Sequence, residues 1–152
     1  MVKRFILIPL MMMWLCASAQ DASKEQVSWI VEYVSIDSLH GELIMKATMD
    51  DGMHIFAIDH TADFGLPTFF EVSSDSSYYY TNGPVLQPDP IIKEGNFSAP
   101  LRYYSHQATF KQAIVTIGKV PFIIKGNINY QACNDEMCFL PKDVPIKVIV
   151  RN

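Results

Sequence analysis

Short runs of alternating hydrophobic and polar residues, separated by turn signals, make up most of the chain after residue 26. This alternation is typical of β-strands with one buried face, and no stretch has the 3.6-residue repeat of a long amphipathic helix. The runs rich in β-branched and aromatic residues predict strands at 27–35, 42–49, 54–58, 68–72, 108–117, 121–132 and 144–150.

About seven short strands with turns at this spacing predict an all-β fold, an immunoglobulin-like antiparallel β-sandwich. Asp50-Asp51-Gly52 is a strong turn signal between two of the strands. Residues 84–100 contain four prolines, so we expect a long loop there with little room for a paired strand. The chain shows no internal repeat, and residues 27–152 are predicted to form one domain.

The N-terminus has the composition of an export signal. Lys3 and Arg4 precede an apolar run over residues 5–15, which is too short to span a bilayer comfortably. Residues 17–19 supply the small-residue pattern that a signal peptidase accepts. We therefore expect residues 1–19 to be a signal peptide cleaved before Gln20, followed by a disordered lead-in over residues 20–26.

A lipid anchor on Cys16 is the alternative fate of this N-terminus, and the large residues at 13–15 disfavour it. No later stretch is long and apolar enough for a transmembrane helix, and we expect the mature chain to be exported. Acidic residues outnumber basic ones by 16 to 12, and cleavage would remove two of the basic ones. This charge disfavours nucleic acid and anionic membrane surfaces as partners.

Export would remove Cys16 and leave Cys133 and Cys138 as the cysteines of the mature chain. Two cysteines separated by four residues usually pair in an oxidising compartment. The pair follows the predicted strand 121–132 and precedes a turn at residues 141–143. We therefore expect it at a strand end or a hairpin tip, near the surface.

The residues alone leave three interpretations of the pair open. A structural staple is the first, but so short a loop restrains the unfolded chain by only about 2 kcal/mol, against more than 4 for a loop of about 100 residues. A redox-active pair is the second, because exposed short-loop bridges are easily reduced. A metal site is the third, and two thiolates supply only half of a tetrahedral zinc shell. The histidines show no ligand spacing and are expected to be ordinary surface or loop residues: His40, His54, His60 and His106.

Acidic residues lie between the two cysteines. Asp135 and Glu136 place negative charge beside the sulfur atoms, and such charge disfavours a thiolate. The reduced pair is therefore expected to be a poor nucleophile in free solution and to react well within a docked complex.

The segment from Ile128 to Pro141 resembles the active-site segment of the N-terminal periplasmic domain of the thiol:disulfide interchange protein DsbD. In both, a strand ends in Tyr-Gln-x-Cys, and a second Cys precedes an aromatic or apolar residue and Pro. The similarity extends more loosely from Val27 to Val150. Residues 51–56 resemble the Asp-Gly-aromatic segment of that family, and Phe97 followed by Tyr104 resembles its cap loop.

This resemblance implies a fold, a route for electrons between partner proteins, and a set of site residues. The fold would be immunoglobulin-like. The pair would receive electrons from a thioredoxin-like or DsbD-like protein and pass them to disulfide isomerases or cytochrome c maturation proteins, with no cofactor beyond the two sulfur atoms. Cys138 would form the mixed disulfide and Cys133 would resolve it. Cap-loop residues Phe97 and Glu94 would shield the pair, and three further residues would line the site: His54, Phe56 and Tyr130.

The sequence also departs from the family pattern. Well-known members space the cysteines by five residues and place an acidic residue two positions before the cap phenylalanine, where this chain has Gly95 beside Glu94. The transmembrane and C-terminal thioredoxin domains do not follow, so we expect another polypeptide to supply the reductant.

A different class of function stays open beside this one. An immunoglobulin-like binding module would use the disulfide only as a local staple. Exposed tyrosines favour binding surfaces, and residues 78–80 and 103–104 are candidates, although packing between strands is the favoured explanation for them.

Overall fold

The computed structural model describes residues 26–151, which form eleven β-strands and no helix. The strands are β1 (Val27–Ser35), β2 (His40–Met49), β3 (His54–Phe56), β4 (Phe69–Val72), β5 (Tyr79–Leu86), β6 (Ile91–Lys93), β7 (Leu101–Ser105), β8 (Gln107–Thr116), β9 (Phe122–Tyr130), β10 (Ala132–Cys133) and β11 (Lys142–Val150). Within residues 26–151, nothing qualifies as a membrane-crossing helix. The predicted signal peptide, Cys16 and nearly all of the lead-in lie outside the described residues.

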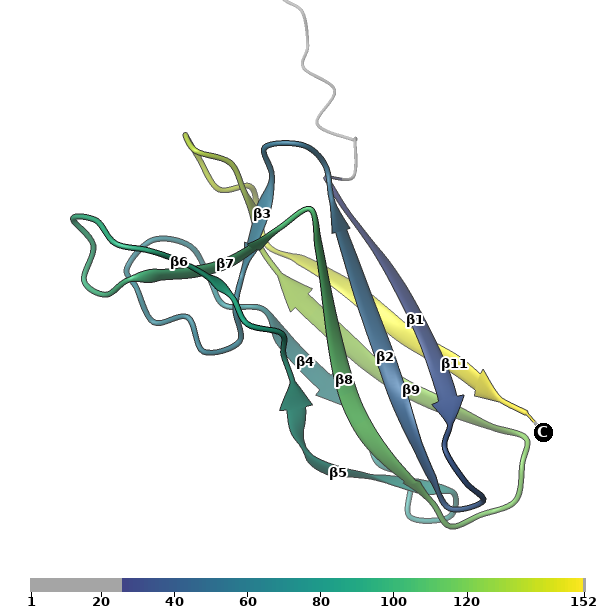
Figure 1. Cartoon of the computed structure of the whole chain (residues 1–152). Coiled ribbons are helices and arrows are strands. Elements are labelled where there is room, and N and C mark those ends of the chain that lie inside the picture. The colour runs from purple at the N-terminus through teal and green to yellow at the C-terminus, as the bar shows by residue number, and fades with distance from the viewer. Residues whose placement is uncertain (1–25, 152) are drawn as a thin grey trace, which may run out of the picture.

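The strands form three antiparallel sheets. One has the order β1-β2-β8-β5, a second β11-β9-β4 and a third β10-β3-β7-β6. The first two run along the length of the molecule as the layers of a sandwich, and the third projects from one end (Figure 1). The predicted antiparallel β-sandwich is confirmed, and we call the third sheet the end sheet.

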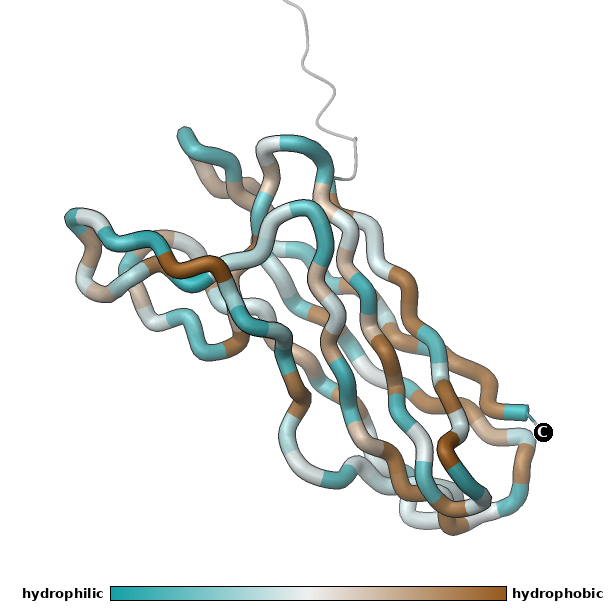
Figure 2. Tube along the Cα trace, viewed as in Figure 1, coloured by the Kyte–Doolittle hydropathy of each residue, from teal (hydrophilic) through white to brown (hydrophobic). Residues whose placement is uncertain are grey.

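Period-two alternation builds the core between the layers. Alternate residues of β2, namely Leu43, Met45 and Ala47, are almost completely buried, and Phe110 and Ile114 of the neighbouring strand β8 are buried on the same face of the sheet. Figure 2 shows the resulting succession of hydrophobic and hydrophilic segments along the strands. Burial of such side chains contributes about 1.5–3 kcal/mol each, so the sandwich itself supplies most of the hydrophobic stabilisation.

The prediction of a long unpaired loop over residues 84–100 is wrong in part. β5 continues to Leu86, and Ile91–Lys93 forms β6, which pairs with β7. Proline is compatible with these strands because β5 and β6 are edge strands, where one side of the backbone needs no donor. An irregularity in β5 leaves the carbonyls of Asn82 and Gly83 to the buried amide of Gln112.

The strand β7 also escaped prediction. Both of its faces are covered in part, so Leu101–Ser105 lacks a clean hydrophobic alternation. His106 follows with a positive φ of 63°, and this single residue carries the chain from the end sheet into β8 of the main sandwich. Two strands that seem continuous in sequence therefore belong to different sheets.

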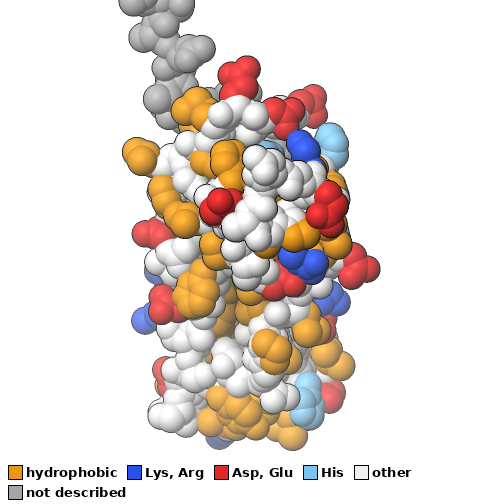
Figure 3. All heavy atoms as spheres, turned by 90° about the vertical axis from the view of Figure 1, so that its left-hand side faces the viewer, with side chains coloured by type: hydrophobic (Ala, Val, Ile, Leu, Met, Phe, Trp, Pro, Cys, Tyr) orange, Lys and Arg blue, Asp and Glu red, His pale blue; other side chains and the backbone are white. Residues whose placement is uncertain are grey.

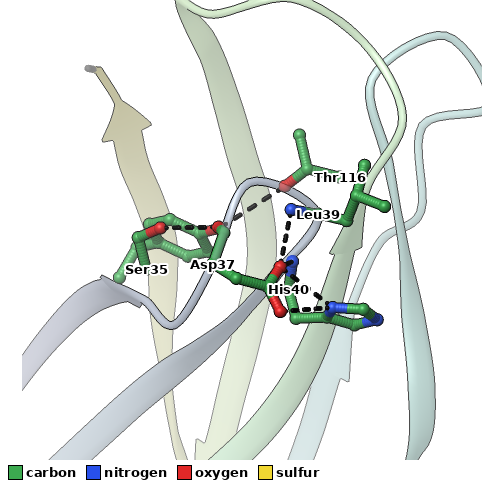
Figure 4. A network of polar contacts seen from close by, with 6 residues as sticks. Ser35, Asp37, Leu39, His40 and Thr116 are labelled. Atoms are coloured by element: carbon green, nitrogen blue, oxygen red, sulfur yellow. Dashed lines mark hydrogen bonds and ion pairs between the residues drawn. The ribbon is translucent and has the colours of Figure 1, made fainter.

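The turn between β1 and β2 lies at the opposite end from the end sheet (Figure 1). One carboxylate oxygen of Asp37 accepts hydrogen bonds from the backbone N–H groups of Leu39 and His40, each 2.8 Å long (Figure 4). The imidazole of His40 lies 2.9 Å from the other oxygen. The bond from Leu39, with the contacts to His40, lowers the pKa of Asp37 below its usual value.

A glycine in β9 allows β4 to pair closely with it. A Cβ atom at Gly126 would lie 2.1 Å from the carbonyl oxygen of Glu71, so Gly126→Ala forces the two strands apart. We expect a loss of about 1–3 kcal/mol in the free energy of unfolding, measured by urea denaturation. The exposed neighbour serves as the control: Lys125→Ala should change this free energy by less than about 0.5 kcal/mol. Equal effects of the two substitutions would contradict the close approach.

Candidate redox site

The two faces of the end sheet have different surroundings. Side chains alternate between the faces along each strand, and residues directly opposite each other share a face. Ala132 pairs with Ile55, and Ile55 pairs with Tyr104. All three are buried in the main core. This face therefore anchors the end sheet to the sandwich.

The other face carries the cysteine pair. Cys133 is paired with His54, and Phe56 is paired with Tyr103. Phe56, Leu101 and Cys133 form a second buried cluster, separate from the main core. Partly buried Ala62, Phe64, Tyr103 and Cys138 pack against this cluster. The disulfide thus has a small hydrophobic environment of its own.

Cys133 and Cys138 form a disulfide across a tight hairpin. The cysteines are directly opposite each other, with 4.0 Å between their Cα atoms. Backbone hydrogen bonds flank them on both sides, from Phe139 N–H to the Ala132 carbonyl (2.8 Å) and from Asn134 N–H to the Met137 carbonyl (2.9 Å). The expectation of a hairpin is therefore met.

The Asn134 side chain holds the turn of this hairpin. Its Oδ1 accepts hydrogen bonds from the N–H groups of Glu136 (2.9 Å) and Met137 (2.8 Å). An asparagine or aspartate side chain commonly stabilises a turn in this way. The short insert between the cysteines is thus a defined turn that keeps the two sulfur atoms within bonding reach.

The two cysteines differ in exposure. Cys133 has no solvent-accessible surface, whereas Cys138 is partly exposed. The expectation of a bridge near the surface therefore holds for Cys138 and is wrong for Cys133, because the loops around Phe56 cover that half. An incoming thiol reaches Cys138 before it reaches Cys133.

The segment 59–66 folds around Phe56 and forms one wall of the cluster. His60 stacks on the Phe56 ring at 4.1 Å, and Phe64 contacts the ring edge-on at 6.1 Å. Gly65 has a positive φ of 80°, and a Cβ there would lie 1.9 Å from the Phe56 ring. Glycine is required at this position for both reasons.

Phe97 lies over this wall. Its ring is 6.1 Å from that of Phe64, and Phe97 is 37% exposed. The neighbouring residues join the two loops reciprocally: Asp63 N–H donates to Ser98 Oγ at 2.9 Å, and Ser98 N–H donates to Asp63 Oδ1 at 3.2 Å. The bond from Ser98 lowers the pKa of the exposed Asp63 carboxyl. Segment 94–100 is therefore tethered where the resemblance implies a cap.

The glycine at position 95 has a local explanation. A Cβ atom there would lie 2.7 Å from Cε2 of Phe97, so the phenylalanine ring occupies the space that a larger residue at position 95 would need. Glu94 is exposed, and it does not line the pocket that includes Asn134 and Asp135 of the cysteine hairpin. The structure thus places Phe97 near the cysteine hairpin and leaves Glu94 at the surface.

That pocket has a volume of about 160 Å³. Its lining combines side chains from the end sheet with the cap segment and the cysteine hairpin: His54, Phe64, Lys93, Phe97, Leu101, Tyr103, Asn134 and Asp135. The His54 ring is 5.1 Å from Tyr103 and 5.3 Å from Phe56. Burial lowers the pKa of His54, while the nearby Asp135 carboxylate opposes this effect.

His60 lies in a loop, one of the two positions expected for the histidines, but its side chain is buried. Only 5% of its surface is exposed, and Nδ1 accepts a hydrogen bond from the Arg102 N–H while Nε2 donates to the Phe64 carbonyl. This arrangement requires the neutral imidazole with its proton on Nε2. No pattern around residue 60 signals a buried histidine, since it lies in a loop whose path depends on Phe56.

Gln131 is a further residue that the sequence interpretation did not assign. Its Nε2 donates to the Phe139 carbonyl at 2.8 Å, and its Oε1 accepts from the Leu66 N–H at 3.0 Å. The side chain therefore ties the cysteine hairpin to segment 59–66. Its position in the Tyr-Gln-x-Cys motif is the feature of the sequence that could have indicated this role.

Tyr130 does not join the cluster around the disulfide. It is buried in the main core, where its ring is 5.6 Å from that of Trp29. The candidate recognition tyrosines are also used in part for packing, because Tyr79 and Tyr104 are buried in the same core. Among residues 26–151, no three His, Cys, Asp or Glu side chains gather as metal ligands would.

Comparisons with known proteins agree with the predicted fold. No protein-family model and no curated protein matches the chain. The reduced DsbD N-terminal domain of Neisseria meningitidis is similar, with a TM-score of 0.51 and 16% identity over 82% of this chain and 86% of that domain. A structure of its complex with the PilB N-terminal domain gives a TM-score of 0.52 and 16% identity, covering 85% and 88%.

The N-terminal periplasmic domain of ScsB from Proteus mirabilis is also similar, with a TM-score of 0.59 and 8% identity over 83% of this chain and 47% of that one. The chain is therefore an immunoglobulin-like β-sandwich that carries a cysteine pair on its end sheet. Within that class, its fold is the one seen in the DsbD N-terminal domain.

Loss of the Asn134 side chain should make the disulfide easier to reduce. Asn134→Ala removes two hydrogen bonds that hold the cysteines opposite each other. A loss of about 1 kcal/mol corresponds to a rise of roughly 20 mV in the reduction potential, measured against a glutathione buffer. Asn134→Asp keeps the oxygen acceptor and is the matched control. An unchanged potential in Asn134→Ala would show that the turn does not depend on this side chain.

Proposed function

We propose that this domain is a periplasmic thiol:disulfide exchange module. Cys133 and Cys138 take electrons from a thioredoxin-like or DsbD-like donor and pass them to an exported acceptor. The unequal exposure of the two cysteines carries this proposal, because a buried sulfur beside an accessible one suits sequential attack. A staple would gain nothing from this asymmetry.

Exchange proceeds through a mixed disulfide. In the direction that oxidises the pair, the accessible Cys138 thiolate attacks the acceptor's disulfide and releases one of its sulfur atoms. Cys133 lies opposite Cys138 in the hairpin and then displaces the acceptor. The reverse sequence reduces the pair. Two sulfur atoms suffice for this chemistry, and no cofactor is required.

The surface around Cys138 suits a protein partner. Met137, Leu140 and Phe97 are exposed by 52%, 85% and 37%. Figure 3 looks onto this end of the molecule, where hydrophobic side chains lie among acidic ones. Exposed apolar residues grouped near a reactive sulfur favour docking over reaction with small thiols. The acidic residues of the hairpin turn favour the same outcome, because they disfavour a free thiolate.

The similar structures support both the partner class and the location. The Neisseria DsbD N-terminal domain forms a complex with the PilB N-terminal domain, and the ScsB domain is periplasmic. For this chain we propose a thioredoxin-like donor, with a disulfide isomerase or a cytochrome c maturation protein as acceptor. The export signal at the N-terminus agrees with that location.

Trapping of a partner tests the proposal directly. A Cys133→Ala variant should accumulate a mixed disulfide through Cys138 with a thioredoxin-like protein whose own resolving cysteine is replaced. The complex should be visible by non-reducing electrophoresis and mass spectrometry. Cys138→Ala is the control and should accumulate much less, because Cys133 is buried. Equal trapping by the two variants would contradict the assignment of Cys138 as the attacking residue.

The reduction potential separates this function from the alternative of a binding module. An exchange pair should have a potential above about −300 mV, within reach of cellular dithiols. A lower potential without any trapped partner would identify the disulfide as a local staple. The measurement uses the unmodified domain, so it does not depend on the partner that is chosen.

Removal of the Phe97 ring should expose the disulfide. The contact between Phe64 and Phe97 contributes about 0.5–1.5 kcal/mol, which corresponds to a roughly two- to tenfold larger open population. Phe97→Ala should therefore raise the rate of reduction by dithiothreitol by a similar factor. Phe69→Ala removes another exposed phenylalanine, from β4, and should leave the rate unchanged. Equal rates of reduction for the two variants would show that Phe97 does not shield the disulfide.

A further inference from the structure

His54 is the titratable residue directly across the strand pair from Cys133. The register of β3 and β10 places these residues opposite each other, so both side chains lie on the same face of the end sheet. Directly opposed residues have Cβ atoms about 5 Å apart. The imidazole also lines a pocket to which the hairpin turn contributes Asn134 and Asp135.

The charged and titratable groups around His54 come from every neighbouring element. Lys93 lies on β6, Tyr103 on β7 and Asp135 in the hairpin turn. Burial is the largest influence on His54 and lowers its pKa below 6.5; Lys93 lowers it further, and Asp135 opposes both. The ring is therefore neutral at pH 7, with a nitrogen lone pair available to accept a proton.

The other histidine packed against Phe56 lacks this capacity. Both ring nitrogens of His60 are engaged in hydrogen bonds, to Arg102 and to the Phe64 carbonyl. Gly95 supplies no carboxylate, and the ring of Phe97 fills the space where one would lie. His54 is thus the histidine of the described chain that combines an unengaged ring with a position opposite Cys133.

We propose that His54 accepts the thiol proton of Cys133 when the disulfide closes. This inference rests on the exchange function proposed above and assigns a proton path to it. The reaction starts from a mixed disulfide between Cys138 and a partner cysteine, with Cys133 as a neutral thiol. Deprotonation of Cys133 is needed at this point because the thiolate is the nucleophile.

The step balances in atoms and electrons. The Cys133 proton moves to a ring nitrogen of His54, and the Cys133 sulfur attacks Cys138 Sγ. The Cys133–Cys138 bond forms while the bond between Cys138 and the partner cysteine breaks. The electron pair leaves on the partner's sulfur, which takes the proton from the imidazolium. Over the whole exchange, two electrons pass from the pair to the partner's disulfide, and His54 returns to its neutral form.

The pH profile of disulfide closure tests this role. Reduced protein reacts with the chromogenic disulfide dithiobis-nitrobenzoate, and the second release of nitrothiobenzoate reports closure in stopped flow. Without a proton acceptor, the rate follows the thiolate fraction and rises with pH up to the thiol pKa. With His54 as acceptor, the rate levels off once the imidazole is neutral.

We expect wild-type closure to level off at the pKa of His54, measured on the same protein by NMR titration. His54→Gln should close at least about tenfold more slowly at pH 7 and keep rising with pH. His40→Gln is the matched control, because His40 begins β2 beside the β1–β2 turn (Figure 4), at the end of the sandwich opposite the end sheet (Figure 1). It should keep the wild-type profile.

His54→Phe provides a second variant if His54→Gln does not fold, because it keeps an aromatic ring between Phe56 and Tyr103. Identical closure profiles in the wild type and the His54 variant would overturn the proposal. The reagent is a small molecule, so this result is independent of any protein partner. Failure to trap a partner would instead count against the exchange function itself.

Discussion

The pairing of β3 with β10 on one side and β7 on the other is the constraint on which the site depends. The pairing is only two or three residues long on each side. Because strand side chains alternate, it directs Ile55 into the main core and leaves Phe56 and Cys133 on the opposite face. A shift by one residue would exchange these faces and bury His54 in the sandwich. The large core therefore fixes the register of a site that it does not contact.

The segments that cover the cluster around Phe56 are linked to one another by few polar interactions. Segment 59–66, the cap segment 94–100 and the cysteine hairpin are joined mainly by the Gln131 amide and the Asp63–Ser98 pair. Regions with few apolar contacts and exposed hydrogen bonds open at lower free energy than the core does. The loops can therefore separate to expose Cys133 while the sandwich stays folded, which is what a resolving cysteine buried at rest requires.

Much of this arrangement was accessible from the sequence because it depends on local patterns. The alternation in β1 and β2, the hairpin position of Cys133 and Cys138, and the sandwich class all follow from period-two hydrophobicity and turn residues. The strands β6 and β7 were missed because edge position and two-sided burial erase that pattern. The burial of Tyr130 in the main core was not predicted either, because the face that a strand residue occupies depends on pairing with distant strands.

The sequence departure at position 95 acquires a physical meaning in the structure. An acidic side chain there and the observed placement of Phe97 are mutually exclusive, since a Cβ atom would already overlap the ring. Position 95 therefore holds a glycine against the Phe97 ring, and the carboxylate nearest to Cys133 along the chain is that of Asp135 in the hairpin turn. A buried cysteine still has to lose its proton before it can attack, and low polarity makes a thiolate costly. The half-buried imidazole of His54 lies opposite Cys133, and its lowered pKa leaves it able to accept that proton.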